Sequence, residues 1–213
     1  MPELIGLGGL KESGKDTFAE GLLDNWRIIG MSDPLLKSLL TLNPYVADNM
    51  RFLELYEKHN EDYVYLKANY PEVRRLLLVM GTEVGRDLLS EDVWVNKAKE
   101  RIAQLHSEGL SVAITGIRFP NELKMIRELN GKLLWVKRAS QTVDKSKFAD
   151  AHSSENSVSE EDFDETILND STVEELKRKA FDFSLLSNET IKENTLKRVN
   201  SFMTDFVEVP GLP

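Results

Sequence analysis

Short apolar runs alternate with amphipathic segments along most of the chain. Apolar residues run without alternation, as in strands buried on both faces of a sheet, at residues 3–9, 27–31, 111–115 and 133–136. Apolar residues recur with helical spacing, between boundaries of Ser, Asp, Pro or Gly, at residues 16–25, 35–42, 71–80, 93–107 and 119–130. This alternation predicts an α/β fold with a parallel sheet and helices on both of its faces.

Two internal segments break the alternation. Residues 45–70 are polar, rich in tyrosine and only weakly helical, and two interpretations stay open for them: a cover over a bound substrate, or a helical hairpin on the surface. Residues 139–161 are rich in Ser, Asp, Glu and Lys and hold His152 and Glu155. We expect this second segment to form a loop or lid.

The C-terminal part contains two similar units, which begin at Phe163 and Phe183. Each reads as a short strand followed by a turn, and either can supply the last strand of the sheet. The first unit is favoured for that strand. A terminal helix is predicted over residues 190–206.

A glycine-rich stretch follows the first predicted strand and reads Gly9-Leu10-Lys11-Glu12-Ser13-Gly14-Lys15. Its Gly-x4-Gly-Lys spacing, between a strand and a helix, is typical of a loop whose backbone N–H groups surround a phosphate. The helix that begins near Gly14 directs the positive end of its dipole at the same anion. Lys15 supplies a mobile positive charge for the β- and γ-phosphates of a nucleotide.

The residue after this lysine is Asp16 rather than Ser or Thr, and a hydroxyl comes one position later, at Thr17. In the common form of the loop, the first hydroxyl holds Mg²⁺. A carboxylate at the same position can hold the metal directly or through water. Asp16 and Thr17 are therefore the predicted Mg²⁺ ligands.

Composition narrows the class of protein. The 213 residues carry a formal net charge of −9 without a basic tract, which argues against a nucleic-acid partner. The absence of cysteine excludes disulfides and thiolate chemistry. No apolar run reaches the about 18 residues of a membrane span, and no signal-peptide pattern opens the chain. We therefore expect no membrane partner and a cytoplasmic location.

Four stretches carry motifs beyond a general phosphate-binding loop. They are residues 9–17 with their Gly-Lys-Asp-Thr ending, Asp33-Pro34-Leu35-Leu36-Lys37, Gly81-Thr82-Glu83-Val84-Gly85-Arg86 followed by Asp92-Val93-Trp94, and Ile114-Thr115-Gly116-Ile117-Arg118-Phe119-Pro120-Asn121-Glu122 with residues 152–155 behind it. Together these motifs resemble the phage-type deoxynucleoside monophosphate kinases. The resemblance spans residues 3–180.

The resemblance implies a P-loop NTPase fold of the nucleoside monophosphate kinase type, as one domain over residues 1–213. It implies a helical insert at about residues 32–90 that binds the acceptor, and a lid-like segment at about residues 139–161. Such enzymes move the γ-phosphate of ATP onto a deoxynucleoside monophosphate with Mg²⁺. ATP, Mg²⁺ and a dNMP would then be the ligands, in the host cytoplasm if a phage encodes the protein, and a homodimer is left open.

The same resemblance assigns roles to individual residues. Lys15 and Arg118 are expected to neutralise charge during transfer, since phosphoryl transfer depends on positioning and charge more than on a base. ATP is expected at Gly9, Lys11, Ser13, Gly14, Lys15, Asp16, Thr17 and Arg138. The acceptor is expected at Asp33, Lys37, Arg75, Gly81, Thr82, Glu83, Arg86, Trp94, Arg118 and Glu122.

Structural alternatives stand beside several of these roles. Lys11 can be a solvated loop lysine, and Arg118 can form an i,i+4 ion pair with Glu122. Arg86 and Glu83 can pair at a helix end. Trp94 lies at the core spacing of its helix.

One position departs from the family pattern. Gly116 stands where these kinases usually carry an Asp, two residues before the arginine of the fourth motif. Metal binding would therefore depend on Asp16 and Thr17. Two other functions stay open: another small-molecule kinase, such as one acting on dephospho-coenzyme A, and a nucleotide-binding protein without turnover, which Gly116 favours.

Overall fold

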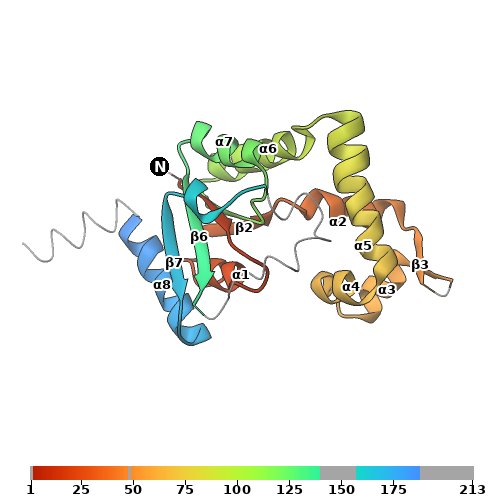
Figure 1. Ribbon diagram of the computed structural model, residues 1–213, viewed down its shortest axis with the longest axis horizontal. Helices are drawn as coiled ribbons and strands as arrows, with labels where there is room; N and C mark the ends of the chain where they lie inside the picture. Colours follow the sequence, from red (N-terminus) through yellow and green to blue (C-terminus); the bar gives the residue numbers. More distant parts are fainter. Residues whose placement is uncertain (1, 48, 140–156, 188–213) are drawn as a thin grey trace, which may run out of the picture.

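A five-stranded parallel sheet forms the centre of the protein (Figure 1). The computed structural model describes residues 2–47, 49–139 and 157–187. The strand order is β2-β5-β1-β6-β7, and each neighbouring pair runs parallel. The strands are β1 (Leu4–Gly8), β2 (Trp26–Gly30), β5 (Ser111–Thr115), β6 (Lys132–Arg138) and β7 (Glu165–Asn169).

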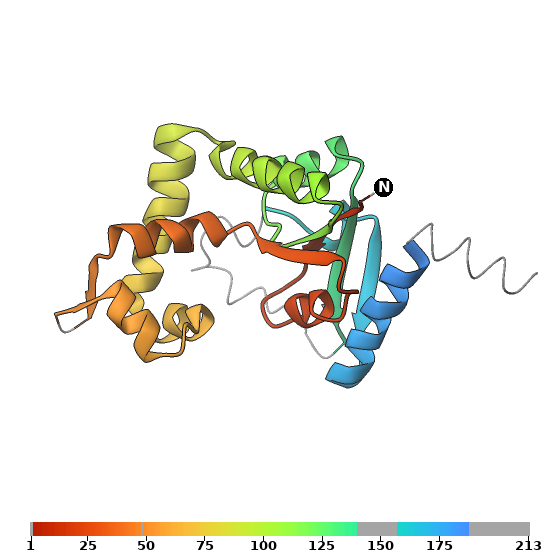
Figure 2. The same cartoon turned by 180° about the vertical axis from the view of Figure 1, so that it is seen from behind.

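Helices cover both faces of this sheet (Figures 1 and 2). On one face lie α6 (Val93–Ser107) and α7 (Pro120–Glu128), and on the other α1 (Lys15–Ala19) and α8 (Val173–Ser187). Successive side chains of a strand point to opposite faces. In β1, Leu4 therefore joins the cluster under α6 and α7, whereas Ile5 joins the cluster under α1 and α8.

The residues between β2 and α6 form a helical part beside the sheet (Figures 1 and 2). Its elements are α2 (Asp33–Leu42), β3 (Tyr45–Ala47), β4 (Met50–Arg51), α3 (Phe52–Lys58), α4 (Tyr63–Asn69), α5 (Pro71–Leu78) and the π-helix η1 (Val79–Leu89). They enclose an apolar cluster of their own, whose fully buried members are Leu39, Phe52, Leu55, Leu66 and Val73. This part brings the second and third sequence motifs next to the carboxyl ends of the strands.

The predicted fold class is confirmed. The strand predicted at 111–115 and the helix predicted at 93–107 have the predicted bounds, as β5 and α6. The first C-terminal unit supplies the last strand of the sheet, β7. Phe183 of the second unit lies in α8 instead, where its ring packs 6.3 Å from that of Phe18. The terminal helix predicted at 190–206 lies outside the described residues.

Two predicted helices have different bounds. The first helix was expected over 16–25 but ends at Ala19; Leu22 and Leu23 reach the same apolar cluster from the following turns. The helix expected to end at Met80 continues as η1 to Leu89. Gly81 suggested a helix end, but the helix continues through it, and Gly85 further along serves a close packing contact with Trp94.

Of the polar segment 139–161, the structure describes residue 139 and residues 157–161. The end of this segment packs against the sheet: Val158 contacts the cluster under α6 and α7, and a short helix, η4 (Glu160–Asp162), follows. Lys137 of β6 pairs with Glu160 at 2.7 Å. The proposed lid itself, with His152 and Glu155, lies outside the described residues and stays a prediction.

Candidate functional site: a phosphate-binding loop beside a cationic pocket

The loop between β1 and α1 has the backbone shape that its glycines suggest. Gly14 has φ +96°, and a Cβ atom there would lie 2.5 Å from the side-chain nitrogen of Asn169. A side chain at Gly14 is thus excluded both by backbone conformation and by space. Lys15 begins α1 directly after this glycine. The loop therefore presents its backbone and the Lys15 side chain at the start of the helix, as an anion site requires.

Asn169 holds this loop from the far edge of the sheet. Its side-chain Nδ2 donates a 2.9 Å hydrogen bond to the carbonyl oxygen of Ser13, and both residues are buried. Asn169 is the last residue of β7, two strands away from β1. Sequence reasoning missed Asn169, because its contact with Ser13 joins segments 156 residues apart.

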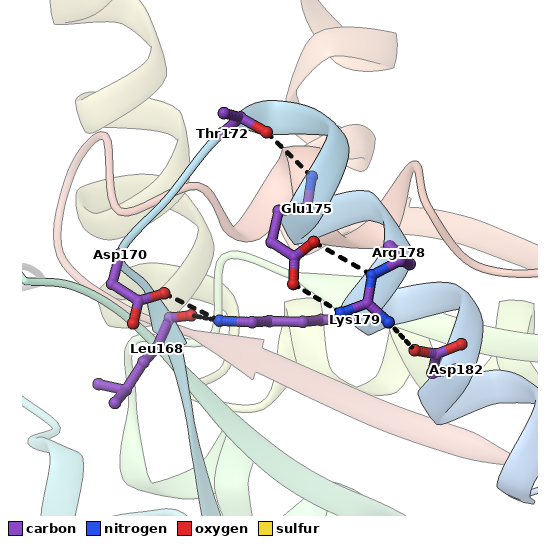
Figure 3. A network of polar contacts seen from close by, with 7 residues as sticks. All are labelled: Leu168, Asp170, Thr172, Glu175, Arg178, Lys179 and Asp182. Carbon is purple, nitrogen blue, oxygen red and sulfur yellow. Dashed lines mark hydrogen bonds and ion pairs between the residues drawn. The ribbon is translucent and has the colours of Figure 1, made fainter.

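A polar network fixes the turn that carries Asn169 (Figure 3). Lys179 of α8 donates to the Leu168 carbonyl at 2.8 Å and to the Asp170 carboxylate at 2.9 Å, so it spans the residues on both sides of Asn169. The Thr172 hydroxyl accepts the Glu175 backbone N–H at the start of α8. The turn between β7 and α8 is thereby tied to the helix that packs against α1.

Lys15 is half-buried, and its surroundings disfavour the charged form of its side chain. Burial lowers the pKa of Lys15 below its usual value, the Asp16 carboxylate opposes that effect, and the Arg118 guanidinium adds to it. Arg118 follows β5, the strand next to β1. The positive charges of the loop lysine and of the arginine in the fourth motif therefore lie near the same space. A bound anion would stabilise both charges.

Beside this space lies a pocket between the sheet and the helical part. Its walls come from α2, α4, α5, η1, α6 and the segment that joins β5 to α7. Of the expected acceptor residues, it is lined by Gly81, Thr82, Arg86, Trp94, Arg118 and Glu122. It is also lined by residues that sequence reasoning did not select, which include Ser32, Tyr63, Lys67, Arg74 and Phe119. Four cationic and three aromatic side chains therefore face one cavity.

Glu122 fixes the turn that carries Arg118. Its buried carboxylate accepts the backbone N–H groups of Arg118 at 2.7 Å and of Phe119 at 3.1 Å. Burial raises the pKa of Glu122, while these two hydrogen bonds and the charges of Arg86 and Arg118 oppose the rise. The ion pair that the i,i+4 spacing suggested is thus a helix cap on the backbone, and Glu122 positions Arg118.

Arg86 offers an unsatisfied donor in this pocket. Its side chain is only 9% exposed, and its guanidinium lies 3.8 Å from the centre of the Phe119 ring. Its Nη2 reaches Asn121 at 3.4 Å and Glu91 at 3.5 Å. Its Nη1 is buried and has no hydrogen-bond partner among the described residues. A buried donor in a pocket calls for an acceptor from a ligand or water.

The third and fourth motifs pack against each other at this point. The Trp94 indole donates its Nε1–H to the Gly81 carbonyl at 2.8 Å, and a Cβ at Gly85 would lie 2.5 Å from the indole ring. Asn121 donates to the Asp92 carboxylate at 2.8 Å. Gly85 therefore admits the tryptophan against η1. Trp94 lines the pocket and also packs, partly buried, against the cluster under α6 and α7.

Four expected acceptor residues do not line the pocket. Arg75 is exposed and bound to Glu72 at 2.7 Å, because its neighbour Arg74 occupies the inward face of α5. Lys37 and Glu83 are exposed on the outer sides of α2 and η1. Asp33 accepts the Gly30 backbone N–H at 2.8 Å, and burial raises its pKa.

The two outlying members of the expected ATP site are also exposed. Lys11 lies on the outer part of the loop, and Arg138 ends β6 beside Asn169. Neither residue lines the pocket.

The expected metal ligands stand at the start of α1. Asp16 is exposed in the first helical turn and acts on Lys15 beside it, and Thr17 is half-buried. Among the described residues, no three His, Asp or Glu side chains gather into a cluster that could hold a metal. One carboxylate and one hydroxyl fit Mg²⁺, which takes few protein ligands and keeps several waters.

A loop of this kind after the central strand of a parallel sheet places the protein in the P-loop class of nucleotide-binding proteins. The sequence profile of the deoxynucleotide monophosphate kinase family matches residues 34–180. The chain therefore belongs to that family.

Relatives of the chain come from viruses. The deoxynucleoside-5′-monophosphate kinase of Escherichia phage T5 is 35% identical over 77 residues, which are 36% of this chain and 29% of the phage protein. A protein of Acanthamoeba polyphaga mimivirus, provisionally named deoxynucleotide monophosphate kinase, is 29% identical over 184 residues, or 81% of this chain and 91% of that one. The chain thus matches under a third of the phage relative's length.

Solved structures give only a general likeness. A sugar kinase from Janibacter sp. HTCC2649 aligns with a TM-score of 0.41 at 15% identity and covers 84% of this chain and 92% of its own. Shikimate kinase from Aquifex aeolicus aligns with a TM-score of 0.40 at 16% identity, and the alignment covers 91% of this chain and 98% of that one.

Within the described residues, no helix is both long and apolar enough to span a membrane.

Proposed function

We propose that the protein transfers the γ-phosphate of ATP to a deoxynucleoside monophosphate and releases ADP and a deoxynucleoside diphosphate. The observation that carries this proposal is the pocket in which Arg86, Arg74 and Arg118 surround a space next to Lys15. Arginine suits bidentate contacts to a phosphate monoester, and the aromatic walls suit a base. The cytoplasm, where both nucleotides occur, is the compartment that this reaction requires.

The reaction needs no general base from the chain. An oxygen of the acceptor phosphate is already an anion, so it attacks the γ-phosphorus as the bond from that phosphorus to the β,γ-bridging oxygen breaks. Lys15 and Arg118 neutralise the charge that spreads over the transferred group. Glu122 holds Arg118 in place through the backbone.

Mg²⁺ would be held by Asp16 and Thr17. The metal supplies charge neutralisation on the phosphates of ATP when it is bound. Asp16 lies next to Lys15 in sequence, so the carboxylate would hold the metal near the phosphates that the ammonium group of Lys15 binds. Gly116 adds no ligand, since it has no side chain.

The reaction is tested by coupled ADP release with each of the four dNMPs, and with dephospho-coenzyme A in a parallel arm. ADP release that depends on a dNMP is the expected result. Release with dephospho-coenzyme A alone would favour the second kinase function, and nucleotide binding without any release would favour the silent protein.

The geometry is tested by two arginine variants in the same assay. Arg118→Ala should lower kcat/KM for the dNMP by about tenfold to a hundredfold, the effect of a charged hydrogen bond, with a smaller change in KM for ATP. Arg75→Ala removes an exposed arginine from outside the pocket and should behave as the parent. Equal effects of the two variants would contradict the assigned pocket.

A further inference from the structure

Tyr63 carries a second unsatisfied group in the pocket. Its hydroxyl is buried and has no hydrogen-bond partner among the described residues, although its ring lines the cavity. A buried polar group without a partner destabilises a folded protein, so native structures rarely keep one without a use. Sequence reasoning did not select Tyr63, because it treated residues 45–70 as a tyrosine-rich segment of uncertain structure.

Packing against neighbouring apolar side chains holds the ring of Tyr63 in place. Tyr63 is the first residue of α4 and packs against the apolar cluster of the helical part, which includes Leu66 and Leu77. The Asp62 side chain caps α4 by accepting the Tyr65 backbone N–H at 2.8 Å. The hydroxyl therefore cannot turn into solvent without unpacking the ring.

Charged groups surround this hydroxyl from two elements. The Asp33 carboxylate of α2 and the Arg118 guanidinium after β5 both act on it, with opposite signs. Burial, with the Asp33 charge, raises the pKa of Tyr63, so the hydroxyl stays a neutral donor at physiological pH. Asp33 is engaged with the Gly30 backbone N–H and accepts nothing from Tyr63.

We propose that the Tyr63 hydroxyl donates a hydrogen bond to the phosphate of the acceptor nucleotide, next to Arg118. This inference rests on the proposed function and adds a specificity contact to it. The acceptor phosphate must lie where Arg118 and Lys15 act together, because transfer occurs there. Tyr63 and Arg118 line the same cavity, so a phosphate held there by Arg118 also lies in the cavity that the Tyr63 ring lines. The bound phosphate would thus contact Tyr63 of the helical part and Arg118 of the sheet part at the same time.

The test uses Tyr63→Phe, which keeps the ring and removes only the hydroxyl. The dissociation constant of each dNMP and the inhibition constant of the matching deoxynucleoside are measured for the parent and the variant. We expect the dNMP to bind about tenfold more weakly, the effect of a lost hydrogen bond to a charged group, and the deoxynucleoside to be unaffected. The Tm of the ligand-free variant should equal or exceed that of the parent, since an unsatisfied buried group is removed.

Tyr65→Phe is the matched control. Tyr65 lies two positions further along α4, is 42% exposed and stacks on His59 outside the pocket. This variant should bind the dNMP as the parent does.

Three results would overturn the inference. A parent that binds no dNMP would remove the proposed function together with it. A parent that binds the dNMP, with Tyr63→Phe unchanged, would remove this inference alone. Equal weakening of the dNMP and the deoxynucleoside would move the contact to the sugar or base.

Discussion

The sheet and the helical part contribute to the site in different ways. The sheet part holds the phosphate-binding loop through long-range contacts, such as the bond from Asn169 to Ser13 across 156 residues of sequence. The helical part is built from short elements and brings Tyr63 and Arg86 to the pocket, each with a donor that has no partner among the described residues. The backbone of the nucleotide-binding loop is thus held in advance, although the buried Ser13 hydroxyl also lacks a partner in the described part of the chain. The two donors on the proposed acceptor side are completed only by the ligand.

The largest expected effect is on the sheet part. Lys15→Ala should lower phosphoryl transfer at least about a hundredfold, since loss of a charge contact to the transition state costs about 3 kcal/mol or more. Burial already lowers the pKa of Lys15, so its removal should not lower Tm. Steady-state turnover and thermal unfolding check both points. Unchanged turnover would refute the assignment of the loop.

Asn169→Ala tests whether the loop must be held in advance. It leaves the buried Ser13 carbonyl without its donor, at a cost in stability of about 1–3 kcal/mol. We expect KM for ATP to rise roughly tenfold while KM for the dNMP stays close to that of the parent. Kinetics with each substrate varied in turn make the measurement. Leu168→Ala is the control, because it shortens a half-exposed side chain next to Asn169 and keeps the carbonyl that Lys179 binds. An equal rise in both KM values would show that Asn169 stabilises the whole cleft.

The sheet part was largely predictable from sequence, and the reason is physical. Strands buried on both faces read as continuous apolar runs, and α6 shows its periodicity over four turns, so both signals are strong. The role of Asn169 was not predictable in the same way. It depends on a contact between β7 and the loop after β1, which no local pattern encodes.

The helical part was predicted less well, because its helices are short and each is buried on one side only. In such segments the apolar spacing cannot decide between neighbours, and Arg75 was chosen where Arg74 faces the pocket. Gly81 was interpreted as a helix end, although the helix continues through it as η1, and Gly85 in the same helix admits Trp94. The resemblance nevertheless placed Arg86, Trp94, Arg118 and Glu122 in one site, as the pocket has them.

Removal of a predicted metal ligand from the sheet part should have a smaller effect on turnover. Asp16→Ala should raise the free Mg²⁺ needed for half-maximal turnover by about tenfold, the equivalent of 1.4 kcal/mol, with metal-free nucleotide binding little changed. Gly116→Asp should lower that requirement: a Cβ there meets no atom within 4 Å, and Asp tolerates the φ of +80° better than most residues. Turnover against free Mg²⁺ decides the matter. Identical curves for the parent and Asp16→Ala would place the metal elsewhere.

The smallest expected effect concerns the turn through which the sheet presents Arg118 to the pocket. Burial raises the folded-state pKa of Glu122 above that of the unfolded chain. Between the two pKa values the folded state binds more protons, so this contribution to stability is present at low pH and is lost as pH rises through the folded pKa. Glu122→Gln can still accept the N–H groups of Arg118 and Phe119, and it should lose about 1 kcal/mol or less from these bonds.

Glu128 on the same helix gives a control of opposite sign. Lys99 lowers the pKa of this exposed carboxyl, so its contribution is present above the unfolded pKa and is lost as pH falls through the folded one. Tm measured against pH should therefore show the deficit of Glu122→Gln shrinking as pH rises, and that of Glu128→Gln growing. Parallel curves for the two variants would mean that Glu122 acts as a cap alone, and that its buried charge does not contribute to the position of Arg118.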